Sequence, residues 1–289
     1  MLRSQVVVMG GAVYVGGGST GSGRGEMSDY VVFRYDLARN EWTHLPPSTV
    51  TCYALVQFMG QLLLVGGKEL GGTVSGKVYR FKMDSKEWEE VLTPLTTPRM
   101  APCVAATQSA LAVGGGMITS AMSIVEVYTR DTSQWHKADP LPLPCTIASS
   151  VTIGNTWYIL GGFLPGYQPS KAVLAVSLDS LTQTAMSSSD QESSVWKMIP
   201  ETYFCGSTAA SFGSHLLSVG GFDAKGHAGQ AICVFVQSSN SWVRVTKLPG
   251  AREGCTAVEL PHKQLFVVGG KDIKEKNTST VFIGSLATQ

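Results

Sequence analysis

The chain has 289 residues, a formal net charge of +1 and a low fraction of charged side chains, 15%. A net charge near zero disfavours partners such as nucleic acid or an acidic membrane surface, because binding to either needs an excess of basic residues. No apolar stretch is as long as a membrane-spanning helix, so no membrane role is expected.

The first elements predicted along the chain are four short strands within residues 1–46. They are expected over residues 5–9, 12–15 and 30–35 and around Trp42. The second strand ends at a pair of glycines, and a glycine-rich loop over residues 18–28 separates it from the third. This order of strand, turn, strand, glycines, strand and tryptophan recurs along the rest of the chain.

Paired glycines follow a short apolar run six times, at intervals of about 50 residues. The pairs are Gly16-Gly17, Gly66-Gly67, Gly114-Gly115, Gly161-Gly162, Gly220-Gly221 and Gly269-Gly270. Tryptophans follow in phase at Trp42, Trp88, Trp135, Trp196 and Trp242. The strand between each pair and its tryptophan carries Tyr35, Tyr79, Tyr128, Val176, Phe235 and, in the sixth repeat, Phe282. Self-similarity with this period predicts a repeat architecture.

Glycine pairs, a tyrosine and a tryptophan in this order resemble the kelch repeat, and the resemblance covers nearly the whole chain. It implies an all-β fold, a six-bladed β-propeller of kelch repeats with four antiparallel strands per blade. The blades are expected at about residues 1–46, 47–94, 95–139, 140–199, 200–248 and 249–289, all within one domain. Large aromatic faces between blades and glycines at close approaches agree with this architecture.

The fourth repeat departs from the pattern. Its third strand is expected over residues 172–178, but its tryptophan is delayed to Trp196. The extra segment, residues 184–194, is polar and rich in serine, which predicts a mobile surface loop with few contacts. Phosphorylation of Ser189 is the alternative, because Glu192 follows it. No segment with helical periodicity is expected anywhere in the chain.

The sixth repeat has three expected strands, over residues 256–259, 265–268 and 280–283, and neither a tryptophan nor a fourth strand. The last blade is therefore predicted to be incomplete in this chain. We expect an exposed sheet edge along residues 280–283, or an edge that a neighbouring molecule covers. Natural sequence before Met1 is one possible source of the fourth strand.

Five of the six cysteines are expected to start the strand before a glycine pair: Cys52, Cys103, Cys145, Cys205 and Cys255. Because they occupy one place in the repeat, we expect them in separate blades, reduced and largely buried as small apolar side chains. A chain of this size does not need a disulfide framework, which favours a reducing compartment and a cytoplasmic location.

Catalytic motifs are weak in this sequence. A GxGxxG pattern at Gly16–Gly21 is followed by a strand instead of the helix that a dinucleotide fold requires. The histidines show no metal-ligand spacing, so neither a metal nor a cofactor is expected. We therefore expect no enzyme and no catalytic residues, with a kelch-propeller enzyme acting on a sugar as the alternative.

Binding residues are predicted on the face that collects the loops after each glycine pair and before each first strand. The resemblance to kelch domains of substrate adaptors, which hold peptides there through Arg and aromatic residues, implies roles for Arg99 and Arg252. Residues just after the glycine pairs occupy the same face: Lys68, Phe163, Phe222 and Lys271. Nearby aromatic candidates are Tyr53, Tyr167 and Tyr203.

The function expected from these features is recognition of a protein or peptide partner by this face. An acidic peptide is one form of this expectation, because two arginines on opposite sides of the mouth could each bind a carboxylate. The resemblance implies substrate capture for a cullin-type ubiquitin ligase, although BTB and BACK segments are not found in the sequence. An excised domain or an actin-associated scaffold is therefore an alternative. The propeller is expected to be a monomer unless flanking domains dimerise it.

Overall fold

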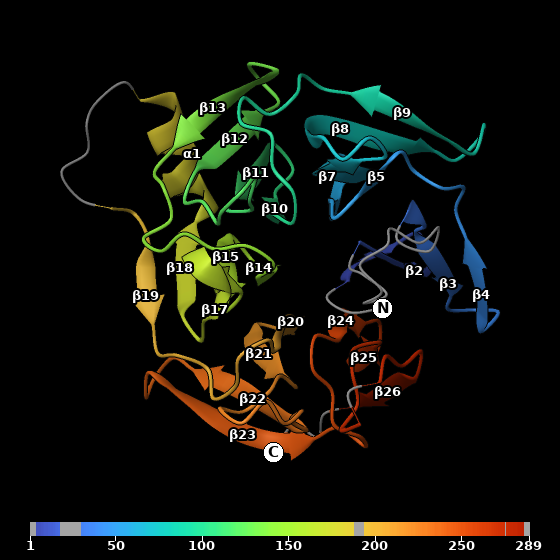
Figure 1. The fold of residues 1–289 in the computed structure, drawn as a ribbon, viewed down its shortest axis with the longest axis vertical. Coiled ribbons are helices and arrows are strands. Elements are labelled where there is room, and N and C mark those ends of the chain that lie inside the picture. The colour runs from blue at the N-terminus through green and yellow to red at the C-terminus, as the bar shows by residue number, and fades with distance from the viewer. Residues whose placement is uncertain (1–3, 18–29, 188–193, 275, 286–289) are drawn as a thin grey trace.

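A computed structural model describes residues 4–17, 30–187, 194–274 and 276–285. Six antiparallel sheets stand around a common centre, and the chain passes through them in order from blade 1 to blade 6 (Figure 1). The innermost strands of neighbouring blades contact one another all the way round, including those of blades 1 and 6. The predicted six-bladed β-propeller is confirmed.

Each sheet draws its strands from one consecutive stretch of sequence. Blade 1 contains β1 (Gln5–Met9), β2 (Ala12–Gly16), β3 (Phe33–Asp36) and β4 (Glu41–His44). Blade 2 contains β5 (Val50–Thr51), β6 (Ala54–Phe58), β7 (Gln61–Glu69), β8 (Val74–Lys82) and β9 (Glu87–Val91). Blade 3 contains β10 (Cys103–Ala106), β11 (Ala110–Gly114), β12 (Val125–Thr129) and β13 (Gln134–Ala138).

Blades 4 to 6 repeat this plan with additions and one omission. Blade 4 contains β14 (Ser149–Ile153), β15 (Thr156–Leu160), β18 (Val173–Ser177) and β19 (Lys197–Ile199), with β16 (Phe163–Leu164) and β17 (Gln168–Pro169) as a small hairpin. A short 3-10 turn, Pro165–Tyr167, joins the two hairpin strands. Blade 5 contains β20 (Thr208–Phe212), β21 (His215–Val219), β22 (Ala231–Val236) and β23 (Ser241–Lys247). Blade 6 contains β24 (Thr256–Leu260), β25 (Gln264–Val268) and β26 (Val281–Ser285).

The paired glycines lie where one blade meets the loop that leads into the next. Gly66 has a φ of +65°, and a Cβ there would lie 2.5 Å from the carbonyl oxygen of Arg99. Gly220 has the same relation to the carbonyl oxygen of Arg252, at 2.4 Å. No other residue type fits this conformation and this close approach together, since a Cβ would overlap the backbone.

The position of the glycine pair was predicted one residue too early in two blades. In blade 1 Gly17 has a positive φ, and in blade 3 Gly115 and Gly116 do, whereas Gly16 and Gly114 are the last residues of strands β2 and β11. Both blades contain three consecutive glycines, so the sequence pattern alone did not identify which two form the turn.

The repeat tryptophans face the aromatic residues of the third strands. Four cross-strand pairs stand directly opposite: Tyr35 and Trp42, Phe81 and Trp88, Tyr128 and Trp135, Phe235 and Trp242. In blade 2 the aromatic residue opposite the tryptophan is therefore Phe81, and the prediction of Tyr79 is wrong. In blade 6 the residue at the corresponding position is Gly284, and the prediction of Phe282 is wrong. Six clusters of buried apolar side chains fill the boundaries between successive blades in the described residues.

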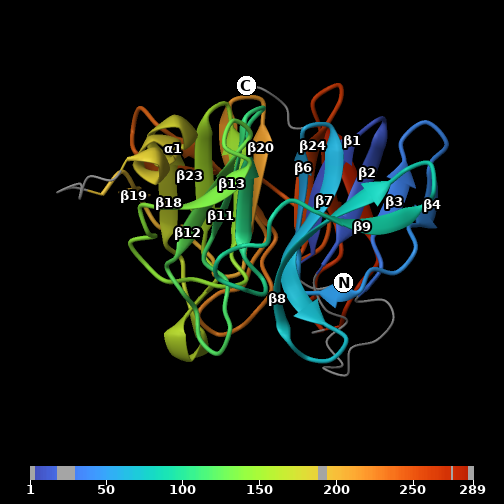
Figure 2. The same cartoon turned by 90° about the horizontal axis from the view of Figure 1, so that it is seen from above.

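Blade 4 contains a helix that sequence analysis did not predict. Helix α1 (Leu178–Met186) directly follows β18 and lies at the outer side of the ring (Figure 2). Leu181 is completely buried in the apolar cluster between blades 3 and 4, and the Thr184 hydroxyl accepts a hydrogen bond from the Asp139 N–H. The prediction that residues 184–194 form a loop with few contacts is therefore wrong for its first part. Ser189 lies outside the described residues.

The cysteines are all free thiols, and four of them, Cys103, Cys145, Cys233 and Cys255, are buried. The prediction that the cysteines share one blade position is wrong. Cys103 is the first residue of β10, whereas Cys145 precedes β14. The thiols of Cys103 and Cys145 meet across the boundary of blades 3 and 4, and the hydrogen bond between them, together with burial, raises the pKa of Cys103.

Candidate functional site

The first strands of all six blades line a central channel with a volume of about 530 Å³. Its wall is built mainly from small apolar and hydroxyl side chains, such as Ala105, Val151, Ser150 and Thr208. Within the described part of the chain, the lining includes no Asp, Glu, Lys, Arg or His. The described channel wall thus offers neither a carboxylate nor an imidazole for acid–base chemistry, and its surface suits an uncharged group.

One residue after each glycine pair occupies the same place at the channel mouth in five blades. Each forms an antiparallel bridge with the loop that leads into the first strand of its own blade. The five residues are Lys68, Met117, Phe163, Phe222 and Lys271, and their bridging partners are Thr51, Met100, Thr146, Cys205 and Glu253. We call these five residues the mouth ring. Four of them were predicted as binding residues.

Met117 was missed because of the register error in blade 3. With the glycine pair placed at Gly114, the residue after it is Gly116, which offers no side chain. With the pair at Gly115 and Gly116, the residue after it is Met117. The run of three glycines was the only signal in the sequence that could have raised this alternative.

The mouth ring has an apolar sector at blades 3 and 4. The rings of Phe163 and Tyr167 meet edge to face with their centroids 6.4 Å apart. The Tyr167 hydroxyl donates to the sulfur of Met117 over 4.0 Å, and the Tyr167 side chain is 62% exposed. Met100, Met117, Phe163 and Tyr167 also line the channel. This sector therefore presents an aromatic and thioether surface beside an uncharged opening.

Two lysines extend the mouth ring on the other side of the channel. Lys68 of blade 2 is exposed and Lys271 of blade 6 is half-buried. These blades flank blade 1, so the two ammonium groups belong to the sector opposite the Phe163–Tyr167 pair. In the described part of the mouth, the positive charges that were expected from arginine thus come from these two lysines.

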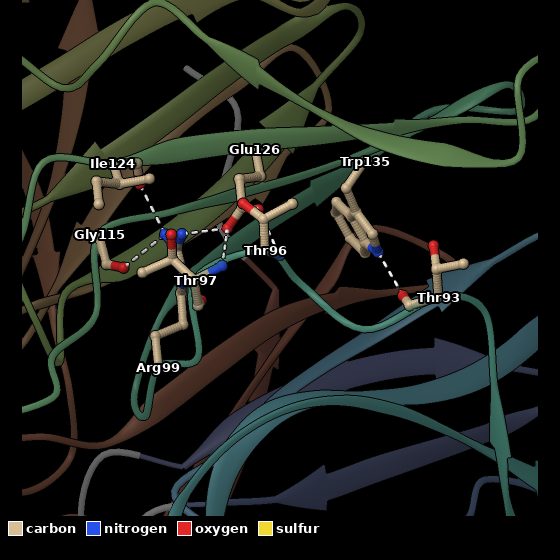
Figure 3. Close-up of polar contacts among 8 residues, drawn as sticks. All are labelled: Thr93, Thr96, Thr97, Arg99, Gly115, Ile124, Glu126 and Trp135. Carbon is tan, nitrogen blue, oxygen red and sulfur yellow. Dashed lines mark hydrogen bonds and ion pairs between the residues drawn. The ribbon is translucent and has the colours of Figure 1, made fainter.

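Arg99 does not face the mouth, which corrects the prediction of a ligand-binding role. Its side chain is completely buried, and Figure 3 shows its polar contacts with Gly115, Ile124 and Glu126 of blade 3. The guanidinium donates to the carbonyl oxygens of Thr97, Gly115 and Ile124 at 3.1, 3.0 and 2.7 Å, and it forms an ion pair with Glu126. Each of its three nitrogens donates within the fold, and its complete burial keeps it away from a ligand at the mouth.

Glu126 completes this network from the third strand of blade 3. Its carboxylate accepts hydrogen bonds from the N–H and hydroxyl of Thr96 and from the N–H of Thr97 (Figure 3). Burial lowers the pKa of the Arg99 guanidinium, and the adjacent Glu126 carboxylate opposes that change. The pair therefore fixes the loop before β10 against β12, which is a structural role.

Arg252 occupies the same place before blade 6 and is also buried, at 7% exposure. Where blade 3 has Glu126, blade 6 has Phe282, as the matching strand registers show. The guanidinium lies 4.8 Å from the centre of the Phe282 ring, and its Nη1 donates to the carbonyl of Ala251. The prediction that it projects into the mouth is wrong, because the blade boundary encloses it.

Two of the predicted tyrosines offer little free surface at the mouth. Tyr53 borders the channel but is only 2% exposed, because it packs against Gly16 and Gly17 of the preceding blade. Tyr203 is 54% exposed, but its hydroxyl donates to the carbonyl oxygen of Trp242 on the outer strand β23 at 2.7 Å. The structure thus keeps Tyr167 at the mouth and places Tyr203 toward the rim.

The loops after the mouth ring in blades 5 and 6 share an aspartate turn. The Asp223 carboxylate accepts from the N–H groups of Lys225 and His227, at 2.8 and 2.9 Å. Asp272 accepts in the same way from Lys274 and Lys276, at 2.8 and 3.0 Å. The backbone hydrogen bonds, chiefly those from His227 and Lys276, lower the pKa of both aspartates, so each turn is stabilised by an ionised carboxylate.

Neither a metal site nor a membrane-spanning helix occurs among the described residues. No three His, Cys, Asp or Glu side chains among them are grouped as metal ligands would be. None of the described helices is both long and apolar enough to cross a membrane.

Comparisons with known proteins agree with the repeat architecture. The family model of the kelch motif matches residues 2–49. Beta-scruin from Limulus polyphemus is 24% identical over 270 residues, which cover 87% of this chain and 28% of that protein. Kelch-like protein 35 from Mus musculus is 27% identical over 164 residues, which cover 55% of this chain and 27% of that protein. The chain thus spans less than a third of the length of these curated relatives.

A solved structure titled "Structure of YjhT" has the same fold. It superposes with a TM-score of 0.77 and covers 98% of this chain and 94% of its own, at 14% sequence identity. At that identity the likeness concerns the architecture of the ring alone.

Proposed function

Because this chain is a kelch-repeat β-propeller, we propose that it binds a protein or peptide partner on the mouth ring and the loops beside it. The observation that carries the proposal is the apolar sector at the mouth. Tyr167 is 62% exposed there, in contact with Phe163 and Met117 and at the opening of an uncharged channel. Exposed aromatic anchors over a pocket are typical of the energetic centre of a protein interface.

The arrangement supports a partner with two kinds of contact group. An apolar side chain of the partner would pack against Phe163, Tyr167 and Met117, where it buries aromatic surface without leaving a charge unpaired. An acidic residue would pair with Lys68 or Lys271 on the opposite side of the mouth. Exposed lysines add little to affinity but orient the partner, so the apolar sector supplies most of the binding free energy in this proposal.

The narrower proposal is that the partner is a substrate of a cullin-type ubiquitin ligase, in the cytoplasm. The alignment with Kelch-like protein 35 and the free thiols support it. An actin-associated scaffold is the second candidate, and co-sedimentation with filamentous actin tests it directly. An enzyme acting on a sugar is the third, and the uncharged lining of the described channel gives it no support. We propose no enzymatic activity.

The proposal is tested with a peptide selected by display on the purified chain. The double variant Phe163→Ala with Tyr167→Ala should weaken its binding by about 30-fold, the loss of roughly 2 kcal/mol expected at a hot spot. Met198→Ala is the matched control, because Met198 is 59% exposed on the outer strand β19. Unchanged binding to the double variant, or an equal loss with Met198→Ala, would show that the partner site lies elsewhere.

A further inference from the structure

One residue in each loop that leads into the first strand of blades 2 to 6 has a left-handed backbone and lines the channel. We call these five the channel-entry residues: Cys52, Ala101, Ile147, Gly206 and Gly254, with φ between +50° and +59°. Their backbone groups join neighbouring blades. The N–H of Ala101 donates to the carbonyl oxygen of Cys52 at 2.6 Å, and the N–H of Ile147 donates to that of Ala101 at 3.2 Å. The N–H of Gly254 donates to the carbonyl oxygen of Gly206, also at 3.2 Å.

A second backbone hydrogen bond accompanies the first at each of these three blade boundaries. The later glycine of the turn donates its N–H to the carbonyl oxygen that lies two residues before the channel-entry residue of the next blade. The three bonds run from Gly67 to Arg99, from Gly116 to Cys145 and from Gly221 to Arg252, each over 2.8 Å. Two backbone hydrogen bonds therefore close the mouth end of the boundaries between blades 2 and 3, 3 and 4, and 5 and 6.

The boundary between blades 4 and 5 has neither bond at its mouth end. In the described part of the chain, the N–H groups of Gly162 and Gly206 and the carbonyl oxygen of Ile147 take part in no hydrogen bond. Further along their first strands the two blades are joined, since the hydroxyls of Ser149 and Thr208 meet at 3.1 Å. We call the three unpaired backbone groups the open joint. Because Gly162 is buried and an unpaired buried N–H is costly, a hydrogen-bonding partner is expected there.

The open joint lies at the mouth of the channel and has an aromatic side chain on either side. Its three residues all line the channel. Phe163 of the mouth ring directly follows Gly162, and the ring of Phe222 covers Gly206, where an added Cβ would lie 2.7 Å from that ring. The two blades are close here, since a Cβ added to Gly161 would lie 4.0 Å from the Gly206 nitrogen. A group that enters the joint thus meets aromatic surface and unpaired backbone groups together.

The unpaired groups favour one class of ligand, because they comprise two donors and one acceptor in an uncharged wall. A carboxylate accepts from the N–H groups but cannot donate to Ile147, and the described lining offers it no cation. An ammonium group only donates, a ketone only accepts, and a hydroxyl must serve all three groups from one oxygen. A neutral carboxamide has a carbonyl oxygen and an N–H₂ group side by side, so it satisfies both kinds of backbone group.

We propose that the open joint binds a neutral carboxamide. The carbonyl oxygen of the ligand accepts from the N–H groups of Gly162 and Gly206, and its N–H₂ group donates to the carbonyl oxygen of Ile147. In a protein or peptide partner this group is the side chain of Asn or Gln, whose aliphatic stem packs against Phe163. The identification of the ligand as part of such a partner rests on the function proposed above for the mouth ring, whereas the carboxamide site itself does not.

The probes are four compounds that share a phenylethyl group and differ in the polar group: hydrocinnamamide, hydrocinnamate, benzylacetone and hydrocinnamyl alcohol. Backbone amide NMR of the complete, isotope-labelled chain should show shifts of Gly162 and Gly206 when hydrocinnamamide is added. Gly67 and Ala101, the paired equivalents at the boundary of blades 2 and 3, are internal controls and should not shift. Hydrocinnamamide should bind at least about 5-fold more tightly than the other three, because each of these loses a hydrogen bond at the joint. No protein variant is needed, so the result does not depend on the folding of one.

Amide hydrogen exchange of the chain alone tests the joint without any ligand. The N–H groups of Gly162 and Gly206 should exchange at least about 10-fold faster than those of Gly67 and Ala101, which are hydrogen-bonded. Equal protection at the two boundaries would overturn the proposal. So would equal binding of the four compounds, or the absence of shifts at Gly162 and Gly206 up to the solubility limit of hydrocinnamamide.

The peptide selected on the purified chain tests the step from carboxamide to partner. Replacing its Asn or Gln by Asp or Glu should weaken binding by about 10-fold, since the added charge enters an uncharged wall and no donor faces Ile147. A peptide that depends on Phe163 and Tyr167 but tolerates this change, or contains neither amide residue, would contradict the inferred partner group and leave the proposed function standing. Hydrocinnamamide bound at the joint, with peptide binding indifferent to Phe163 and Tyr167, would contradict the proposed function and leave the carboxamide site standing.

Discussion

The carboxylate of Glu126 and the guanidinium of Arg99 form an ion pair in the interior of blade 3, and both side chains are completely buried. The two residues come from different parts of the repeat, the loop before the first strand and the third strand. Their contact closes the blade boundary beside Gly115, whose carbonyl oxygen accepts from Arg99. An arginine at a place where adaptor propellers are expected to bind ligands is thus a structural element of this chain.

Replacement of Arg99 by alanine should destabilise the fold by about 3–5 kcal/mol, because it leaves the Glu126 carboxylate buried without a counter-charge. Denaturant unfolding of the purified variant measures this loss. The double variant Arg99→Met with Glu126→Leu should recover much of it, since neither charge is then left alone. Arg130→Ala, an exposed position after β12, is the control and should change stability by less than about 0.5 kcal/mol. A stable Arg99→Ala protein that has lost only partner binding would contradict the structural role.

Gly66→Ala should be strongly destabilising, by roughly 3 kcal/mol or more, because it combines a left-handed backbone with a clash. The added Cβ would lie 2.5 Å from the carbonyl oxygen of Arg99. Gly10→Ala is matched in conformation, with φ of +57°, but nothing lies within 4 Å of its Cβ, and it should cost only about 1 kcal/mol. Thermal and denaturant unfolding compare the two. Equal losses of stability in the two variants would mean that the close approach at Gly66 adds nothing to the cost of the substitution.

Leu181→Ala tests whether helix α1 is part of the core of the ring. Its side chain is completely buried between blades 3 and 4, so its truncation should cost about 2–5 kcal/mol. Met186→Ala in the same helix, at a side chain that is 51% exposed, should cost much less. If Leu181→Ala is as stable as the unaltered protein, then the segment after β18 is the peripheral loop that its polar composition predicted.

The aspartate turns of blades 5 and 6 should lose their order in acid. The pKa values of Asp223 and Asp272 are lowered in the folded state, so the stabilisation that each carboxylate provides is present above its unfolded pKa of about 4 and is lost as the pH falls through the lower folded pKa. Carbon-detected NMR titration of the two carboxyl groups measures both pKa values. Asp223→Asn should abolish the pH dependence of its own turn and leave that of Asp272 unchanged. Midpoints at or above the ordinary aspartate value would contradict the hydrogen bonding.

The periodic part of the fold could be predicted from sequence because each blade needs the same few residue types. The recurring glycine pairs and tryptophans allowed the number of blades to be predicted, and the missing sixth tryptophan predicted that the sixth blade is short. The register of blade 3 could not be obtained in this way, since Gly114, Gly115 and Gly116 are equivalent in sequence and only their φ angles distinguish them. Met117 was lost from the predicted site for that reason.

The role of the arginines could not be predicted because burial of a loop residue depends on a partner far away in sequence. Arg99 is enclosed because Glu126 stands at an inward-facing position of β12, and that lone acid between Val125 and Val127 was the available signal. Helix α1 was missed for a related reason. Its three buried residues, Leu178, Leu181 and Ala185, span only two helical turns, which is too short for a convincing helical period.

The central claim, that a partner binds at the mouth ring, is tested most directly by methionine methyl NMR of the chain with its selected peptide. Met100 and Met117 line the channel at the apolar sector, whereas Met59, Met83 and Met198 are exposed in strand turns and on an outer strand. We predict that the methyl signals of Met100 and Met117 shift on addition of the peptide and that the other three do not. Shifts confined to Met59, Met83 or Met198 would contradict the account.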